Sequence, residues 1–205
     1  MECFATHTGL VLPLDRIDVD TDQMVPKQFC KFLTRSGYGR VLFYDWRYQS
    51  GEQPDPAFVM NWPRYQGASI LLSRANFGCG SSREHAVWAC CDFGFRVIIA
   101  SSYAEIFYNN CFKNGLLPVT LEDGEVEELF RLSNYKTDYR LTVNLEKQTI
   151  EDQFGLQFAF SINSFRRDCL LRGIDEIDIT MAKEDRIAAY ERSRNDQSKL
   201  YGSLD

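Results

Sequence analysis

The sequence has few histidines and no pair of cysteines with the spacing of a metal site. Its two histidines are His7, near the start of the chain, and His85, so a centre built on several histidines is excluded. Its seven cysteines are odd in number, two of them are adjacent, and none are spaced C-x-x-C. This pattern argues against a disulfide framework and against an iron–sulfur cluster held within the chain. We therefore expect a protein of the reducing cytoplasm.

Long hydrophobic runs and a basic excess are also missing. No stretch approaches the eighteen apolar residues of a membrane span, and the first residues lack the character of a secretory signal. Twenty-three basic residues face 29 acidic ones, for a net charge of −6. We expect no broad binding to nucleic acid or to an anionic membrane, although a local cationic pocket is still compatible with this charge.

What remains is an ordinary globular composition, with 44% hydrophobic and 14% aromatic residues in 205. The length fits one domain over residues 1–205. Glycines and prolines predict mobile loops at 28–40 and 49–57, and the polar end predicts a frayed tail at 193–205.

Strand-like and helix-like segments alternate through the middle of the chain. Apolar runs predict strands at 9–14, 68–72, 96–100 and 116–120. A helix is expected over 82–92, and a second is expected where Ser102 and Glu105 form a capping-box pattern, ending near Gly115. Pro118 suggests an edge strand. The order β-α-β-α-β implies parallel pairing.

The last third predicts an antiparallel extension of this sheet. Strand patterns occur at 140–145, 149–153 and 156–162, and helices are expected at 126–132, 165–171 and 184–192. The predicted fold class is therefore α/β, with a mixed sheet around a parallel β-α-β-α-β core.

The most informative stretch for chemistry is 76–86, Asn-Phe-Gly-Cys-Gly-Ser-Ser-Arg-Glu-His-Ala, at the turn from a buried strand to a helix. Glycines allow a close approach to the backbone, and unpaired helix-start amides attract anions. Arg83 adds a planar fork suited to a carboxylate or phosphate. A small-anion site is one interpretation; a capped helix with Arg83 and Glu84 in solvent is the other.

Several familiar motifs fail in this stretch. Arg83 stands where a dinucleotide fingerprint needs glycine, the Gly-Lys-Ser/Thr of a P-loop is absent, and Cys79 stands where a hydrolase elbow needs serine. Ser81 and His85 would share a helix face, which leaves a serine–histidine pair open. The acidic run from Asp18 lacks the glycine and glutamate of a calcium loop.

Four segments together resemble a known family: 76–86, Asp20-Thr21-Asp22-Gln23, Asp45-Trp46-Arg47 and 106–110 (Ile-Phe-Tyr-Asn-Asn). The chain is similar to the small subunits of 3-isopropylmalate dehydratase, in the aconitase superfamily, from about residue 9 to residue 191. Val87 and Ser101 depart from the pattern, where proline is expected.

This resemblance implies a layered β/β/α fold of the aconitase swivelling-domain type. It also implies a larger partner subunit, in a heterodimer or heterotetramer, that carries a [4Fe-4S] cluster, so this chain itself would bind no metal and no cofactor. The implied substrate is a small dicarboxylate, 2-isopropylmalate, converted to 3-isopropylmalate through 2-isopropylmaleate in leucine biosynthesis.

The resemblance also implies roles for individual residues. Ser81 would be the catalytic base, acting as an alkoxide held by Arg83 and by helix-start amides. Ser82 and Arg83 would bind the substrate carboxylate, and Thr21 and Asp22 would complete the substrate site as orienting residues. Cys79 would be a turn cysteine and no ligand.

Specificity would come from the loop after the first motif. Phe32 and Leu33 are the candidates for contact with an isopropyl group, and Arg35 keeps a carboxylate-reading alternative open. A citraconate or methylmalate hydratase subunit is the nearest rival function. A lone serine hydrolase using Ser81 and His85, and a carboxylate-binding module without catalysis, are alternatives of other classes.

Overall fold

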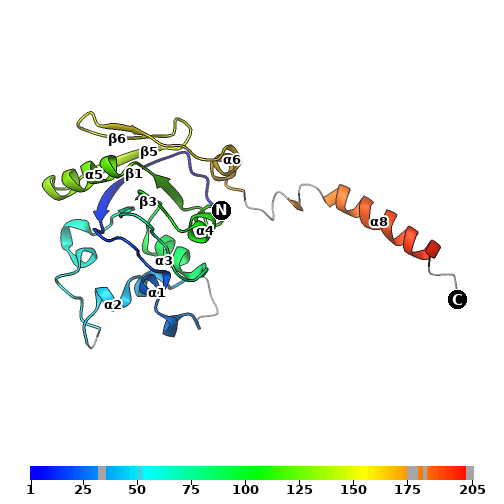
Figure 1. Ribbon diagram of the computed structural model, residues 1–205, viewed down its shortest axis with the longest axis horizontal. Helices are drawn as coiled ribbons and strands as arrows, with labels where there is room; N and C mark the ends of the chain where they lie inside the picture. Colours follow the sequence, from blue (N-terminus) through cyan, green and yellow to red (C-terminus); the bar gives the residue numbers. More distant parts are fainter. Residues whose placement is uncertain (32–35, 51, 175–179, 182–183, 202–205) are drawn as a thin grey trace. The chain divides into compact units, whose positions relative to one another are not determined.

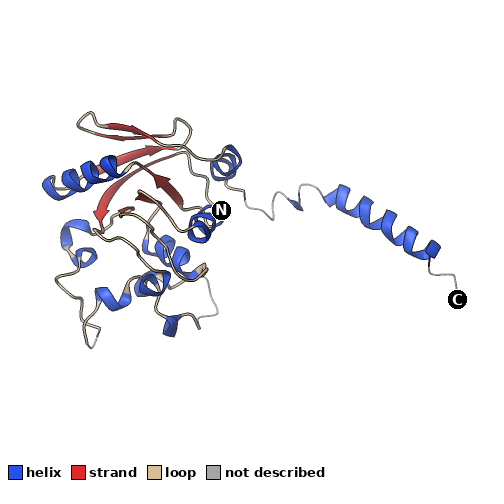
Figure 2. Cartoon of the chain, viewed as in Figure 1, coloured by secondary structure: helices blue, strands red, loops and turns tan. Residues whose placement is uncertain are grey.

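The computed structural model describes residues 1–31, 36–50, 52–174, 180–181 and 184–201 (Figures 1 and 2). By its contacts the chain divides into two compact units, Met1–Gly173 and Ile174–Asp205. The first unit contains the whole sheet, and the second contains helix α8 (Glu184–Tyr201). Within the described residues no helix is both long and apolar enough to cross a lipid bilayer.

Seven strands form one mixed sheet in the order β4-β3-β2-β1-β5-β6-β7. The first four pair in parallel, and β5, β6 and β7 extend the sheet in antiparallel fashion from β1. The predicted parallel core, its antiparallel extension and the edge position of the strand with Pro118 are therefore confirmed. Their bounds are β1 Thr6–Pro13, β2 Ile70–Leu72, β3 Val97–Ala100, β4 Leu117–Thr120, β5 Arg140–Asn144, β6 Thr149–Asp152 and β7 Gln157–Ala159.

One α-helix follows each of β2, β3 and β4, whereas a longer connection joins β1 to β2. In its described residues that connection holds two short α-helices, α1 and α2, and four short 3-10 helices, whereas α3, α4 and α5 follow β2, β3 and β4 in turn. The bounds are α1 Thr21–Met24, α2 Tyr44–Arg47, α3 His85–Phe93, α4 Glu105–Lys113, α5 Asp123–Tyr135 and α6 Ser164–Arg172. Polar composition predicted fraying from residue 193, and α8 includes this stretch as far as Tyr201.

The parallel strands bury side chains on both faces of the sheet, as expected when helices cover both sides. Leu71 and Ile98 point into one cluster, which contains Phe77, Phe107 and residues of α3. Ile70 and Ile99 point into the other, which contains Leu129 and Phe130 of α5. Figure 1 accordingly shows α5 on one side of β1 and α1, α2 and α3 on the other.

Two local predictions around the sheet are wrong. Helix α3 begins at His85 and not at Ser82, so residues 81–83 form a loop before it. Ser102 caps no helix: α4 begins at Glu105 after Ala104. The Ser102 hydroxyl instead accepts a hydrogen bond from the backbone N–H of Asn76 at 2.8 Å. The sequence pattern predicted a helix cap at Ser102, but a tertiary contact uses its side chain.

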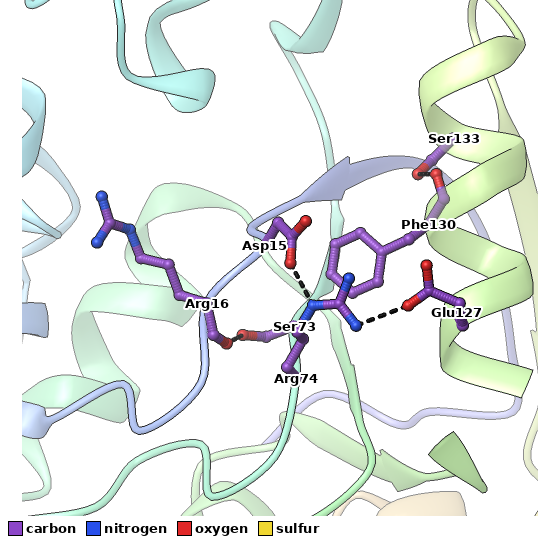
Figure 3. Close-up of polar contacts among 7 residues, drawn as sticks. All are labelled: Asp15, Arg16, Ser73, Arg74, Glu127, Phe130 and Ser133. Atoms are coloured by element: carbon purple, nitrogen blue, oxygen red, sulfur yellow. Dashed lines mark hydrogen bonds and ion pairs between the residues drawn. The ribbon is translucent and has the colours of Figure 1, made fainter. Parts of the chain in front are cut away.

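The end of β2 is fixed by Arg74, two residues before the Asn76 loop (Figure 3). Its guanidinium pairs with Asp15, which follows β1, and with Glu127 of α5 at 2.7 Å. It also lies over the ring of Phe130, 4.5 Å from the centroid. Hydrogen bonds to the two carboxylates raise the pKa of Arg74 above its ordinary value. Arg74 therefore joins two strand ends and a helix at the edge where the motif begins.

We predict that Arg74→Met lowers the free energy of unfolding by about 1–2 kcal/mol, because two partly exposed ion pairs and a cation–π contact are lost. Urea denaturation at low salt measures this. Arg131→Met is the control, since the ion pair of Arg131 within the described residues is with Glu128, three residues away on the exposed face of α5; it should leave stability unchanged. Equal stability of Arg74→Met and the parent chain would contradict the prediction.

Candidate functional site

The candidate site lies where the loops after β1 and β2 meet. Because these strands are parallel neighbours, their carboxyl ends share one edge of the sheet. The N–H groups of Gly78 and Cys79 donate to the carbonyl of Val19, at 2.8 and 3.1 Å, and the N–H of Thr21 donates to the carbonyl of Cys79 at 2.9 Å. These backbone bonds place the Asp20–Gln23 segment beside residues 76–83, as their joint role in the predicted site requires.

Gly78 has a structural role in this loop. Its φ is +77°, in the left-handed region that favours glycine. A Cβ at this position would collide with the side chain of Phe107 from α4. The Phe107 ring in turn packs edge-on against Phe77, with centroids 5.4 Å apart. The Ile106–Asn110 segment thus supports the motif loop from below.

Ser81 is held through its backbone, and its hydroxyl side is open. The buried Thr21 donates its hydroxyl to the Ser81 carbonyl at 2.9 Å, and the N–H of Arg83 donates to the same oxygen at 2.8 Å. Ser81 and Ser82 are both exposed. The structure therefore fixes the position of Ser81 and leaves its side chain accessible to a molecule at the surface.

Arg83 lies close to one acidic side chain and one thiol in the site. Its guanidinium forms an ion pair with Asp22, and its Nη1 donates to Sγ of Cys30 at 3.1 Å. Lys27 lies on the other side of Asp22, 3.6 Å from its Oδ2. The Arg83 side chain is 20% exposed, and the Asp22 side chain is 36% exposed. Asp22 thus orients a half-buried guanidinium beside the two exposed serines.

The two thiols near the site favour the protonated form. Burial raises the pKa of Cys30. Burial, followed by the negative charges of Asp20 and Asp18, raises the pKa of Cys79. A thiol nucleophile needs the opposite shift. Neither cysteine is therefore prepared for nucleophilic chemistry.

His85 is packed among aromatic rings. Its ring centroid lies 5.3 Å from that of Tyr38 and 4.8 Å from that of Trp88. Burial, and then the charge of Arg83, lowers its pKa. Since α3 starts only at His85, the expectation that Ser81 and His85 share a helix face is wrong. Among the described side chains no hydrogen bond joins these two residues.

The Asp45-Trp46-Arg47 segment forms α2 and supports the site from behind. The N–H of Phe43, just before α2, donates to the carbonyl of Met24 at the end of α1, at 2.7 Å. Trp46 stacks on Phe43 and carries the Arg16 guanidinium on its ring, 4.3 Å from the centroid. Arg47 donates to the carbonyls of Gly39 and Leu42. The Phe43 bond thus connects the start of α2 to the end of α1, and Trp46 and Arg47 pack around this connection.

Two further expectations concern the specificity loop and metal binding. Phe32, Leu33 and Arg35, predicted to determine specificity, lie outside the described residues. Across the described ranges no group of three or more His, Cys, Asp or Glu side chains is placed to hold a metal ion.

Comparisons with known proteins cover most of the chain. Residues 1–124 match the family model of the aconitase C-terminal domain, and residues 127–164 match the LeuD_N model. A protein of Brevibacillus brevis named 3-isopropylmalate dehydratase small subunit is 53% identical over 194 residues, which are 95% of this chain and 100% of that protein. The chain belongs to the family of 3-isopropylmalate dehydratase small subunits. This family consists of hydro-lyase subunits of the aconitase superfamily.

A solved structure confirms the fold expected for this family. The crystal structure of 3-isopropylmalate dehydratase from Methanocaldococcus jannaschii matches with a TM-score of 0.64, at 23% identity, over 91% of this chain and 99% of that one. The mixed sheet with its parallel core is thus the swivelling-domain architecture that the resemblance implied.

Sequence reasoning missed two residues at the site. Cys30 left no signal, because only folding brings it to Arg83. Asp20 did leave one: Asp20 followed by Gln23 three residues later is a capping-box pattern, and the structure contains this box at the start of α1. The pattern lies within the acidic run that begins at Asp18.

We predict that acidification destabilises the protein partly through His85. Its folded pKa lies below the ordinary 6.5, so the unfolded chain binds more protons around pH 6. This part of the stability is present above about pH 6.5 and is lost as the pH falls towards the folded pKa. Urea denaturation between pH 7.5 and 5.5 should show a smaller loss for His85→Phe, which keeps a ring between Tyr38 and Trp88.

His7 provides the comparison, because burial and then Arg96 also lower its pKa. His7→Phe should remove a separate part of the same pH dependence. An unchanged slope of stability against pH in His85→Phe would show that the charge of this ring does not matter to folding.

Proposed function

We propose that this chain is the small subunit of a two-chain hydro-lyase that isomerises 2-isopropylmalate to 3-isopropylmalate through 2-isopropylmaleate, in leucine biosynthesis. One observation carries the proposal. An exposed Ser81 is held by its backbone beside Ser82 and beside a guanidinium that Asp22 orients, in a chain 53% identical to a named small subunit of this enzyme.

In this proposal Ser81 moves the proton. As an alkoxide it accepts the proton from the carbon next to the hydroxyl-bearing one, while the hydroxyl leaves as hydroxide and 2-isopropylmaleate forms. Ser81 then returns the proton to the carbon that lost the hydroxyl as hydroxide adds to the neighbouring carbon, which regenerates the alkoxide. An ordinary serine is too weak an acid for this role, so nearby positive charge must stabilise the ionised form. Arg83 is the positively charged residue closest to Ser81 in the sequence.

Arg83 and Ser82 bind a substrate carboxylate. A guanidinium matches a carboxylate with two parallel hydrogen bonds, and the exposed Ser82 hydroxyl adds a third donor. Thr21 acts indirectly, because its hydroxyl is engaged by the carbonyl of Ser81. Asp22 likewise acts through Arg83. Both residues orient the groups that touch substrate.

The partner is a large subunit that carries a [4Fe-4S] cluster. When bound there, the cluster supplies a Lewis acid for the hydroxyl that leaves and returns. The cysteines near this chain's site are protonated turn or loop residues, which is consistent with a cluster held elsewhere. We place the assembled pair in the cytoplasm, bound to neither nucleic acid nor membrane.

Residues 28–40 join the site to the substrate side chain in this proposal. Cys30 contacts Arg83 at the start of the segment, and the N–H groups of Gly37 and Gly39 donate to Asp92 of α3 near its end, at 2.9 and 2.8 Å. The segment is thus attached to Arg83 of the motif near its start and to α3, the helix that follows the motif, near its end. Phe32 and Leu33 are proposed to meet the isopropyl group, with Arg35 as the carboxylate-reading alternative.

We predict that Ser81→Ala lowers kcat of the reconstituted pair by about 10²–10⁴-fold, the usual worth of a general base. The measurement is conversion of 2-isopropylmalate after co-expression with a large subunit. The exposed Ser161, outside the motif, provides the control Ser161→Ala, which should match the parent pair. Full activity of Ser81→Ala would favour a carboxylate-binding module, and ester cleavage with phosphonate labelling by the lone chain would favour a serine hydrolase. Faster turnover of citramalate-type acids would indicate the rival hydratase.

Arg83→Lys should lower kcat/KM of the pair by about 100-fold or more, because an ammonium cannot form two parallel bonds to a carboxylate. Steady-state kinetics on 2-isopropylmalate measure the change. Lys27→Arg is the control, because Lys27 also pairs with Asp22 but lies on the side away from Arg83's contact. Near-normal kinetics in Arg83→Lys would remove Arg83 from the substrate site.

A further inference from the structure

We propose that Asp20 is a positioning residue for this reaction: its single carboxylate sets the geometry of both Asp22 and the loop that carries Ser81. The inference rests on the proposed function and assigns a role to a residue outside the groups that would touch substrate.

The first contact of Asp20 is with the Asp22 segment. Its Oδ1 accepts a hydrogen bond from the N–H of Asp22 at 2.7 Å, and the Gln23 side chain accepts from the N–H of Asp20 at 3.0 Å. This reciprocal pair fixes the first turn of α1. The direction from which Asp22 reaches Arg83 therefore depends on Asp20.

The second contact of Asp20 is with the residue just before Ser81. Gly80 has φ +87°, and a Cβ built there would collide with both carboxylate oxygens of Asp20. The carboxylate thus lies directly against the backbone at position 80. The neighbouring backbones are also paired, since Asp20 and Cys79 form an isolated parallel bridge.

These two contacts make Asp20 a further link between the two loops of the site. Through Asp22 it acts on the Arg83 guanidinium, and through Gly80 it acts on the backbone just before Ser81. A shift of about 1 Å between a base and the group that holds the substrate can cost about 100-fold in rate. A residue that fixes both groups with one carboxylate prevents such a shift without touching the substrate.

The test uses the full chain co-expressed with a large subunit and kcat per assembled complex. Asp20→Ala should lower kcat about 100-fold with a much smaller change in KM, since the carboxylate-binding groups remain present. Asp20→Asn retains an oxygen acceptor and the same shape, so it should restore kcat to within about threefold of the parent. A role confined to folding would instead lower the Tm and the yield of complex, leaving kcat per complex unchanged, and that result would overturn the proposal.

Gly80→Ala tests the second contact, and Gly67→Ala is its matched control. Gly67 also has a positive φ, of +78°, but no atom lies within 4 Å of a Cβ built there. Both variants carry backbone strain, whereas only Gly80→Ala pushes against Asp20. Gly80→Ala should lower kcat as Asp20→Ala does, and Gly67→Ala should leave kcat unchanged. Equal kcat values in the two glycine variants would contradict the proposal.

A double-mutant cycle in unfolding gives a readout that does not depend on activity. The destabilisation caused by Gly80→Ala should be smaller in the Asp20→Ala background than in the parent, because the colliding carboxylate is gone. The effect of Gly67→Ala should be the same in both backgrounds. Additivity at position 80 would overturn the contact itself. Failure of the parent pair to convert 2-isopropylmalate would instead overturn the proposed function and with it the positioning role of Asp20.

Discussion

The site depends on the pairing of two loops that leave neighbouring parallel strands. Backbone bonds between residues 19–21 and 78–79, together with the Thr21 hydroxyl on the Ser81 carbonyl, hold the two loops as one unit. Parallel strands make this possible because their carboxyl ends lie side by side. Without that pairing, Asp22 and Arg83 would belong to separate mobile loops. With it, Asp22 and Arg83, sixty-one positions apart in the sequence, form an oriented ion pair.

The electrostatics of this unit fit a site that is incomplete in the lone chain. Ser81 is exposed, and in water a serine hydroxyl stays protonated, because the surrounding solvent weakens any stabilisation from a nearby cation. A partner surface that covers the serines would exclude water and strengthen the effect of Arg83. Under the proposed function, the same contact that delivers the partner's half of the site also creates the environment in which Ser81 can act.

Features that depend on neighbouring residues in the sequence could be predicted, whereas features that depend on tertiary contacts could not. The strands of the parallel core are short apolar runs, so their existence followed from the sequence, although β1 begins at Thr6, three residues before the expected start at residue 9. The start of α3 did not follow from the sequence. Ser81 and Ser82 have the residue type of helix N-caps, but the carbonyl of Ser81 accepts a hydrogen bond from Thr21. Ser102 was misjudged for the same reason, since its hydroxyl bonds to Asn76 instead of a helix end.

The sequence by itself determined the class of fold and the residue types of the candidate site, because hydrophobic periodicity and the Gly-Cys-Gly-Ser-Ser-Arg segment are local patterns. Only the tertiary structure decided which groups meet: Cys30 with Arg83, Asp20 with Gly80, Phe107 beneath Gly78, and His85 between Tyr38 and Trp88. Such contacts join elements whose distance in the chain carries no information about their distance in space. They are set by the parallel register of β1, β2 and β3, which exists only once the sheet has formed.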